Sequence, residues 1–206
     1  MSERPLTGMG EDGIPPEAQA DIAGAVRAAL SKHGYARLTT AKIAAEADVS
    51  EAGLYYHCDS KDEMIAVFLR AATDYLAEEL AAVDADGPEA KLRAALDRLY
   101  TDIDDETARG IDIAVMELLS HAPHDETLRD SLLAMQRNTL DHLADVIAEG
   151  VRDGSFREVD PDGAAAFLLA AAHGSTGFYL ALGMESAGDA LHAQVDAYVD
   201  WLVGED

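Results

Sequence analysis

Residues Thr39–Lys61, TTAKIAAEADVSEAGLYYHCDSK, decide the predicted fold of this 206-residue chain. They contain two short helical patterns joined by a three-residue turn, Asp48-Val49-Ser50. We expect Thr40 to cap the first helix and Ser50 the second, because a side-chain oxygen at the N-cap accepts a hydrogen bond from an unpaired backbone N–H. Two helices at this spacing predict a helix-turn-helix, whose second helix enters the major groove of DNA.

The remainder of the chain also predicts helices, with no alternating strand pattern and no internal repeat. Residues 1–16 lack periodicity and predict a flexible arm. A first helix ends at Gly34, and the capping box Ser60-x-x-Glu63 opens a long fourth helix. Later helices are expected after the break at 84–88 as far as Ile103, around 111–122, from 128 to 153, from 160 to about 183, and from near Asp189. The predicted fold class is all-α, with about nine helices.

The charge of the chain is strongly negative, with 40 acidic against 15 basic residues and a net charge of −25. Residues 27–61 differ, since five basic and four acidic side chains give a net charge of +1. Positive charge therefore gathers where DNA is expected to lie. A carboxylate-rich surface with few lysines predicts a halophilic protein, because concentrated salt screens its self-repulsion. The alternative is an acidic all-helical interaction protein that does not bind DNA.

Neither export nor a membrane span is predicted, because the chain has no charged-then-apolar leader and no run of 18 apolar residues. A single cysteine, Cys58, excludes an internal disulfide and fits a reducing cytoplasm. No glycine-rich phosphate loop, nucleophile elbow or distinct carboxylate pair favours an enzyme, and no cofactor is predicted.

The chain resembles the TetR family of one-component transcriptional regulators over about residues 21–80. The residues that carry the resemblance are Gly34-Tyr35, Thr40, Ile43-Ala44, Val49-Ser50, Leu54-Tyr55, His57 and Ser60-Lys61. Beyond them, Gly154-Ser155-Phe156-Arg157, then Asp160-Pro161-Asp162 and an Ala-rich helix, resemble the AcrR/BetI-type ligand-binding domain. Two residues depart from the family pattern. Asp48 replaces a glycine, but aspartate tolerates a left-handed conformation, and Cys58 replaces a phenylalanine beneath the recognition helix.

The resemblance implies a DNA-binding domain over 17–62 and a helical ligand-binding and dimerisation domain over 63–206, linked by the fourth helix. It implies homodimers through helices 8 and 9, whose small residues allow close packing. By position, it also implies a DNA-facing set of Thr40, Lys42, Ser50, Glu51, Ala52, Tyr55, Tyr56, His57 and Lys61. Hydroxyl, imidazole and ammonium groups suit phosphate contacts, whereas Glu51 and Ala52 suit base edges.

A small-molecule effector is expected to enter a cavity among helices 4 to 8 and to swing the fourth helix, so that the dimer leaves a palindromic double-stranded DNA operator. The candidate ligand-binding residues are apolar or adaptable groups on those helices, namely Tyr100, Met116, His121, Met135, His142, His173 and Phe178. The sequence identifies neither the effector nor the operator, and it does not distinguish a repressor from an activator.

Several residues keep a second interpretation. Tyr55 can belong to the domain core rather than to the DNA face. His121-x-x-His124-Asp125 has a spacing open to a metal, although a solvated helix end with histidines near its last carbonyls explains it as well, and no metal site is predicted. Cys58 is either a redox sensor or a small buried hydrophobe.

Overall fold

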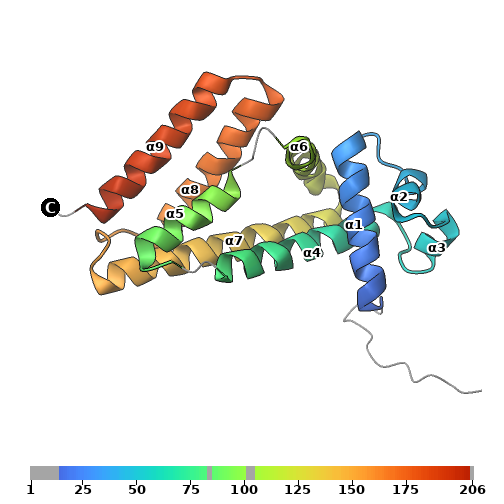
Figure 1. Cartoon of the computed structure of the whole chain (residues 1–206), viewed down its shortest axis with the longest axis horizontal. Coiled ribbons are helices and arrows are strands. Elements are labelled where there is room, and N and C mark those ends of the chain that lie inside the picture. The colour runs from blue at the N-terminus through green and yellow to red at the C-terminus, as the bar shows by residue number, and fades with distance from the viewer. Residues whose placement is uncertain (1–13, 83–84, 101–104, 205–206) are drawn as a thin grey trace, which may run out of the picture.

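The computed structural model describes residues 14–82, 85–100 and 105–204 (Figure 1). Within these ranges the chain is helical and has no strand, which confirms the predicted all-α fold. The helices are α1 (Pro16–His33), α2 (Thr40–Ala47), α3 (Glu51–Tyr55), α4 (Lys61–Ala81), α5 (Pro88–Leu99), α6 (Glu106–His121), α7 (Glu126–Asp153), α8 (Pro161–Thr176) and α9 (Glu185–Val203), with a short 3₁₀ helix at Ala122–His124 and a π-helical turn at Gly177–Ala181.

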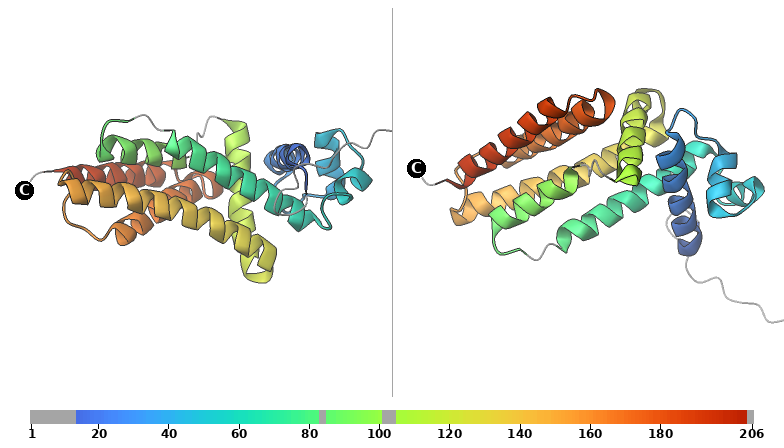
Figure 2. Two further views of the ribbon diagram at one scale, coloured as in Figure 1. Left: turned by 90° about the horizontal axis from the view of Figure 1, so that it is seen from below. Right: turned by 45° about the horizontal axis from the view of Figure 1, so that its top comes forward.

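The helices α4 and α7 lie side by side along the length of the molecule (Figures 1 and 2). At one end, α1, α2 and α3 gather around the start of α4. At the other end, α8 and α9 pack together, and α8 also rests on α7. Since α6 packs on α1, it lies between the helix-turn-helix and the rest of the chain.

Each end of the molecule has its own hydrophobic core. The first joins α1 to α4 with α6 and the beginning of α7, through buried side chains such as Leu118, Leu128 and Leu132. The second joins α5, the later part of α7, α8 and α9. Because α6 packs on α1 and α7 packs on α4, the first core joins the N-terminal helices to helices of the C-terminal region.

The turns of the helix-turn-helix follow from their capping residues, with one correction. Thr39, not Thr40, caps α2: the Thr39 hydroxyl accepts from the Lys42 N–H at 3.3 Å, because Thr39 is extended whereas Thr40 is already helical. Asp48 adopts the left-handed conformation expected of it, with φ 54°. Ser50 caps α3 as predicted and accepts from the Gly53 N–H at 3.1 Å.

The predicted N-terminal arm extends too far into the fold. Ile14 is buried in the first core, and its carbonyl accepts a hydrogen bond from the Gln19 amide at 3.1 Å. The first helix then begins at Pro16, a residue whose missing N–H is harmless at that position. Residues 1–13 of the predicted arm, and Ile103 of the predicted fifth helix, lie outside the described residues.

Two later helices begin earlier than their apolar patterns predict. Helix α6 begins at Glu106 rather than near Ile111, because Asp105 caps it and accepts from two backbone N–H groups of the first turn. Helix α9 begins at Glu185 rather than near Asp189. Both early segments lack large apolar side chains, so apolar periodicity does not extend over them.

The helix α8 begins as predicted but ends differently. Asp160 caps it, accepting from the Gly163 N–H at 3.2 Å, and Pro161 occupies the first turn. Regular α-helix stops at Thr176, and a π-helical turn continues the chain to Ala181 instead of a single helix to Gly183. Such π turns are rare and are frequent at functional sites.

Candidate DNA-binding surface and effector cavity

The short helix α3 presents its aromatic end to solvent. Leu54 is buried in the first core, whereas Tyr55 is 48% exposed and Tyr56 is 84% exposed. The structure therefore favours the outward orientation of Tyr55 over the core interpretation. A tyrosine as exposed as Tyr56 makes little contribution to packing, so its ring and hydroxyl are free to meet a partner.

Two of the remaining predicted DNA-facing residues, Thr40 and Glu51, are bonded to each other, and Lys42 is held by a backbone carbonyl. The Thr40 hydroxyl donates to the Glu51 carboxylate at 2.6 Å and so ties α2 to α3. The Lys42 ammonium donates to the Arg37 carbonyl at 2.6 Å. Ala52, like Glu51, is exposed on α3. The Thr40–Glu51 hydrogen bond therefore links α2 to α3 in the free protein.

Two side chains at the end of this surface stack on aromatic rings. The His57 ring meets the Tyr56 ring edge to face, with centroids 4.9 Å apart. The Lys61 ammonium lies 4.3 Å from the centroid of the Tyr35 ring, a cation–π contact. Lys61 thus has a structural role in the free protein in addition to its predicted phosphate contact.

Cys58 is 1% exposed and packs in the first core. Burial, the largest effect, together with the nearby carboxylates of Glu63 and Asp59, raises the pKa of the thiol to about 11, against the opposing influence of Arg70. A protonated, buried thiol reacts slowly, because the thiolate is the nucleophile. The structure favours the small-hydrophobe interpretation over the redox sensor.

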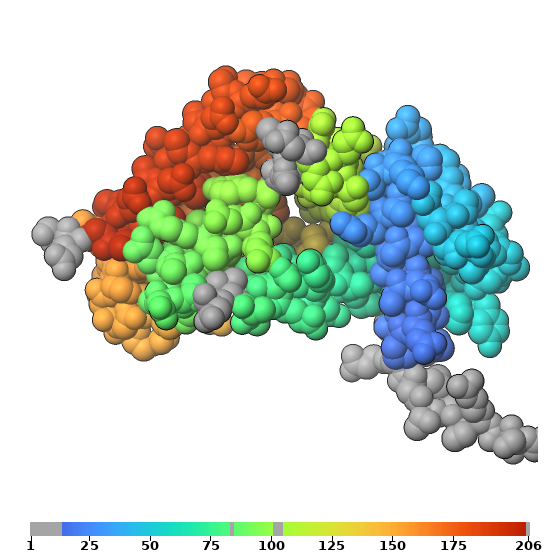
Figure 3. Space-filling view, in the orientation of Figure 1, coloured from blue at the N-terminus to red at the C-terminus, as the bar shows by residue number. Residues whose placement is uncertain are grey.

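A cavity with room for a small molecule, which we call the large cavity, lies among α4, α5, α6, α7 and α8 and has a volume of about 460 Å³. Figure 3 shows the surface hollowed between α4, α5 and α6, with α7 at the bottom of the hollow. Most of the lining is apolar, and the polar groups include Asp112 and His173. Although His173 is exposed, partial desolvation lowers its pKa, and nearby Asp112 opposes that shift. This size and lining are typical of small-molecule sites.

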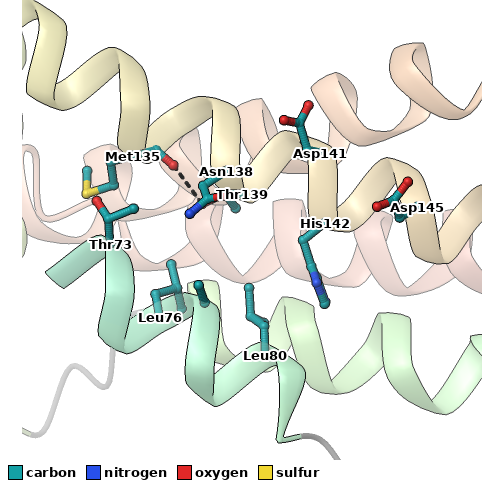
Figure 4. A pocket seen from close by; sticks show the side chains of 10 residues that line it. Thr73, Leu76, Leu80, Met135, Asn138, Thr139, Asp141, His142 and Asp145 are labelled. Atoms are coloured by element: carbon teal, nitrogen blue, oxygen red, sulfur yellow. Dashed lines mark hydrogen bonds between the residues drawn. The ribbon is translucent and has the colours of Figure 1, made fainter. Parts of the chain in front are cut away.

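Three of the seven predicted ligand residues, Met116, Met135 and His173, line this cavity. His142 instead lines a second pocket of about 210 Å³ between α4 and α7, to which Met135 also contributes (Figure 4). Burial lowers the pKa of His142, and Asp145 opposes the shift. In Figure 4 the His142 ring points toward α4, whereas Asp141 points away from it.

The other three predicted ligand residues line none of these cavities. The Tyr100 ring lies against His192 in a tilted arrangement, with centroids 4.0 Å apart, and its buried hydroxyl has no hydrogen-bond partner among the described residues. His121 lies against the Tyr35 ring, with centroids 4.8 Å apart, at the junction with the helix-turn-helix. Phe178 belongs to the π-helical turn.

The helix α6 is hydrogen-bonded to the turn that follows α1. One Glu117 carboxylate oxygen accepts from the Tyr35 N–H at 2.5 Å and from the Ala36 N–H at 3.2 Å. Near the N-terminal end of α6, Gly110 packs so closely on Ser31 that a Cβ at residue 110 would collide with the Ser31 carbonyl oxygen. The opposite side of α6 lines the large cavity, so one helix contacts both the cavity and the turn that leads from α1 to α2.

The Ala-rich segment of α8 divides between the interior and the surface. Ala164, Ala165, Leu168, Leu169, Ala171 and Ala172 are buried within the chain. Phe167 points outward at 48% exposure and meets Tyr198 of α9, with ring centroids 5.0 Å apart. Tyr198 in turn stacks on Trp201, whose exposed fraction equals that of Phe167. These three rings form an aromatic strip across α8 and α9.

The same region contains the one described segment, Pro161–Ala181, that could cross a bilayer by length and composition, with a mean hydropathy of 1.3. The sequence pattern of uninterrupted apolar residues had not indicated it. In the structure this segment packs against α5, α7 and α9. Apolar composition here accompanies helix packing within the chain.

The sequence gives weak signals for the contacts between helices. Glu117 is one of 40 acidic residues, and nothing in its neighbourhood distinguishes it from a solvated surface group. Gly110 stands within a helical pattern, where a glycine often has a packing reason, and this was the available signal for the α1–α6 contact. Thr39 and Thr40 were equally good caps by residue type.

Two family models match the chain. The model described as bacterial regulatory proteins, tetR family, matches residues 22–67, and the one described as BetI-type transcriptional repressor, C-terminal, matches residues 88–204. No curated protein matches the chain.

Solved structures of regulators are similar over nearly the whole chain. A TetR transcription regulator from Haloarcula marismortui is 27% identical, with a TM-score of 0.80 over 90% of this chain and 98% of that one. A transcriptional regulator from Saccharomonospora viridis in complex with choline is 18% identical, with a TM-score of 0.78 over 92% and 99%. The regulator FadR from Bacillus subtilis, in complex with stearoyl-CoA, is 16% identical, with a TM-score of 0.69 over 90% and 97%.

Proposed function

The chain belongs to the TetR family of transcriptional regulators, and from that membership we propose that it is a homodimeric repressor, released from its DNA operator by a small-molecule effector. Residues 17–62 form the DNA-binding domain, and residues 63–206 form the ligand-binding and dimerisation domain. It acts in the cytoplasm by binding, not by catalysis. The observation that carries the proposal is the exposed aromatic end of α3, with Tyr56 84% exposed beside a capped helix-turn-helix.

In the proposed complex, α3 enters the major groove. Tyr56, His57 and Lys61 hold the phosphate backbone, because their hydroxyl, imidazole and ammonium groups donate to phosphate oxygens. Glu51 and Ala52 face base edges, where a carboxylate accepts from cytosine and a methyl group meets thymine. To reach a base, Glu51 gives up its hydrogen bond from Thr40, so DNA binding rearranges that contact.

The proposed dimer forms through the outward sides of α8 and α9. The aromatic strip of Phe167, Tyr198 and Trp201 supports this, because large aromatic side chains are enriched at the buried centres of interfaces. A dimer also presents two recognition helices, as a palindromic operator requires at a spacing of about 34–36 Å.

The effector is proposed to occupy the large cavity, with Met116, Met135 and His173 among its contacts. Its predominantly apolar lining suits a small, largely apolar molecule. Two of the three solved relatives are in complex with choline and with stearoyl-CoA, so the same fold accepts very different ligands.

Two helices, α4 and α6, are proposed to transmit effector binding from the cavity to the DNA-binding helices. Helix α4 lines the cavity and leads directly from α3, so its displacement moves the recognition helix. Helix α6 lines the cavity as well, and Glu117 connects it to the turn after α1. An effector shifts the equilibrium only by its difference in affinity for the two arrangements of these helices.

We further propose that the regulator works in concentrated salt. A dimer carries twice −25, or −50, a charge that repels DNA at low ionic strength. Salt near 1 M shortens the screening length to about 3 Å and so removes most of that repulsion. The similarity to a regulator from a halophile, Haloarcula marismortui, supports this proposal.

Selection of bound sequences from a random pool of duplex DNA in about 1 M KCl tests the function directly. The proposal predicts one enriched pseudo-palindrome whose half-sites lie about 10–10.5 base pairs apart. If folded protein enriches no sequence, the chain is an acidic helical interaction protein instead. Deleting the gene then separates repressor from activator, since transcription from the selected operator rises only when a repressor is lost.

A further inference from the structure

A second groove lies on the side of the chain where α1, α4 and α6 meet, and it has a volume of about 420 Å³. We call it the Arg27 groove. Ala23, Gly24 and Arg27 of α1 form one wall, and Ala71 and Tyr75 belong to the facing wall on α4. Phe68, Ala72 and Ile111 line both this groove and the large cavity, so the two spaces adjoin.

Most residues that line the Arg27 groove are apolar, and one of them, Gly24 in the α1 wall, has no side chain. A Cβ at Gly24 would meet no atom within 4 Å, so the helix surface is recessed there. Glycine in a helix interior carries a conformational cost, yet no close backbone approach requires it at this position. The absence of a side chain at Gly24 therefore leaves open space beside α1.

The rim of the groove carries one positive charge. Arg27 is exposed and makes no ion pair or hydrogen bond with the described part of the chain. Two other arginines of this acidic protein do form ion pairs, Arg93 with Asp200 and Arg98 with Glu79. An unpaired guanidinium beside an apolar groove provides the two elements that an amphipathic anion requires, a planar set of donors and a dry surface.

We propose that the Arg27 groove binds an amphipathic monocarboxylate, with the carboxylate on the Arg27 guanidinium and the apolar chain along α4 toward Ile111. A single carboxylate is favoured over a phosphate dianion, because one arginine cannot offset two charges brought toward a protein of net charge −25. The inference does not depend on DNA binding. It adds a site to the proposed effector cavity, at the junction of α1 with α4 and α6.

Fluorescence titration with a dansyl-labelled undecanoic acid, in the same concentrated KCl, tests the site on the full chain without DNA. The expected result is saturable binding, displaced by decanoate well ahead of decylamine or decanol. Displacement is also expected to strengthen roughly fourfold per added methylene until the groove is full, the increment that burial of one methylene gives.

Three variants locate the bound probe. Arg27→Gln keeps most of the volume but loses the charge, and it is expected to weaken decanoate binding roughly tenfold, the effect of one charge-assisted contact. Gly24→Leu fills the groove and is expected to abolish binding. Arg152→Gln removes the same charge from an exposed position on α7 and is expected to change nothing.

The proposal is overturned if decanol displaces the probe as well as decanoate, or if Arg27→Gln binds like Arg152→Gln. A Met116→Trp variant, which fills the adjoining cavity, tests whether the probe binds there instead of in the groove. If it abolishes probe binding while Gly24→Leu does not, the carboxylate occupies the effector cavity and the groove is empty. Circular dichroism and thermal melting confirm that each variant is folded, and none of these outcomes bears on operator binding.

Discussion

Tyr56 is the residue on which the proposed DNA contact is easiest to isolate. At 84% exposure its side chain is almost free of the core, unlike Lys61, whose ammonium rests on the Tyr35 ring. Loss of Tyr56 therefore removes a phosphate contact with little effect on folding, whereas loss of Lys61 affects both.

We expect Tyr56→Ala to weaken operator binding about tenfold and to leave the melting temperature unchanged, because one hydrogen bond is lost and no core contact. Fluorescence anisotropy with operator DNA measures the first effect and a thermal melt the second. Leu133→Ala, a partly exposed position on α7, serves as the control. Equal operator affinity in the Tyr56 and Leu133 variants would show that α3 does not carry the contact.

Cys58 gives a prediction about pH. Because burial raises the pKa of its thiol to about 11, thiolate is scarce at pH 8 and increases only as pH approaches that value. Reaction of the folded protein with Ellman's reagent at pH 8 is expected to be more than about a hundredfold slower than that of the unfolded chain. Rapid labelling of the folded protein would restore the redox-sensor interpretation.

At the scale of elements, α6 connects the cavity to the helix-turn-helix. Its Glu117 carboxylate satisfies two backbone N–H groups of the turn after α1, which no other side chain is shown to bind. Gly110 lets the same helix approach the Ser31 backbone. A movement of α6 therefore transmits directly to α1.

Removing the Glu117 carboxylate leaves two turn N–H groups without their acceptor. We expect Glu117→Ala to lower the free energy of unfolding by about 1–3 kcal/mol. A chain of this size loses about 2–4 °C in melting temperature per kcal/mol of that free energy. Glu117→Gln keeps an acceptor oxygen and is expected to lose less. Glu78→Ala, an exposed residue of α4, removes the same charge without these bonds; an equal shift in both alanine variants would argue against the contact.

Local patterns predicted most of the elements, whereas contacts between residues far apart in the sequence gave no local signal. Ser50, Asp160 and the left-handed Asp48 act within a few residues of themselves, so the sequence identified them. Glu117 and Tyr35 are 82 residues apart, and no local rule relates them. Helix position and residue type pointed to Met116, Met135 and His173 in the cavity lining, but Phe178, in the π-helical turn, does not line it.

At the scale of the whole molecule, the aromatic strip across α8 and α9 is the proposed dimer surface. Phe167→Asp is expected to yield monomers by light scattering, since burying an unpaired charge in an interface costs several kcal/mol. Leu133→Asp introduces the same charge at a similarly exposed position on α7 and is expected to leave the dimer intact. A Phe167 variant that remains dimeric would place the interface on another surface.

The central claim is a sequence-specific repressor suited to concentrated salt, and anisotropy of the selected operator across about 0.2 M to about 3 M KCl tests it most directly. Each phosphate contact ordinarily releases counterions and lowers affinity with a logarithmic slope of about −0.9. Here, screening of the −25 charge of each chain opposes that loss, and cations taken up between facing carboxylates and phosphates reduce it further. The account predicts specific binding that persists above 1 M KCl with a nearly flat slope. A steep negative slope, with binding lost by about 0.5 M while circular dichroism shows folded protein, would contradict it.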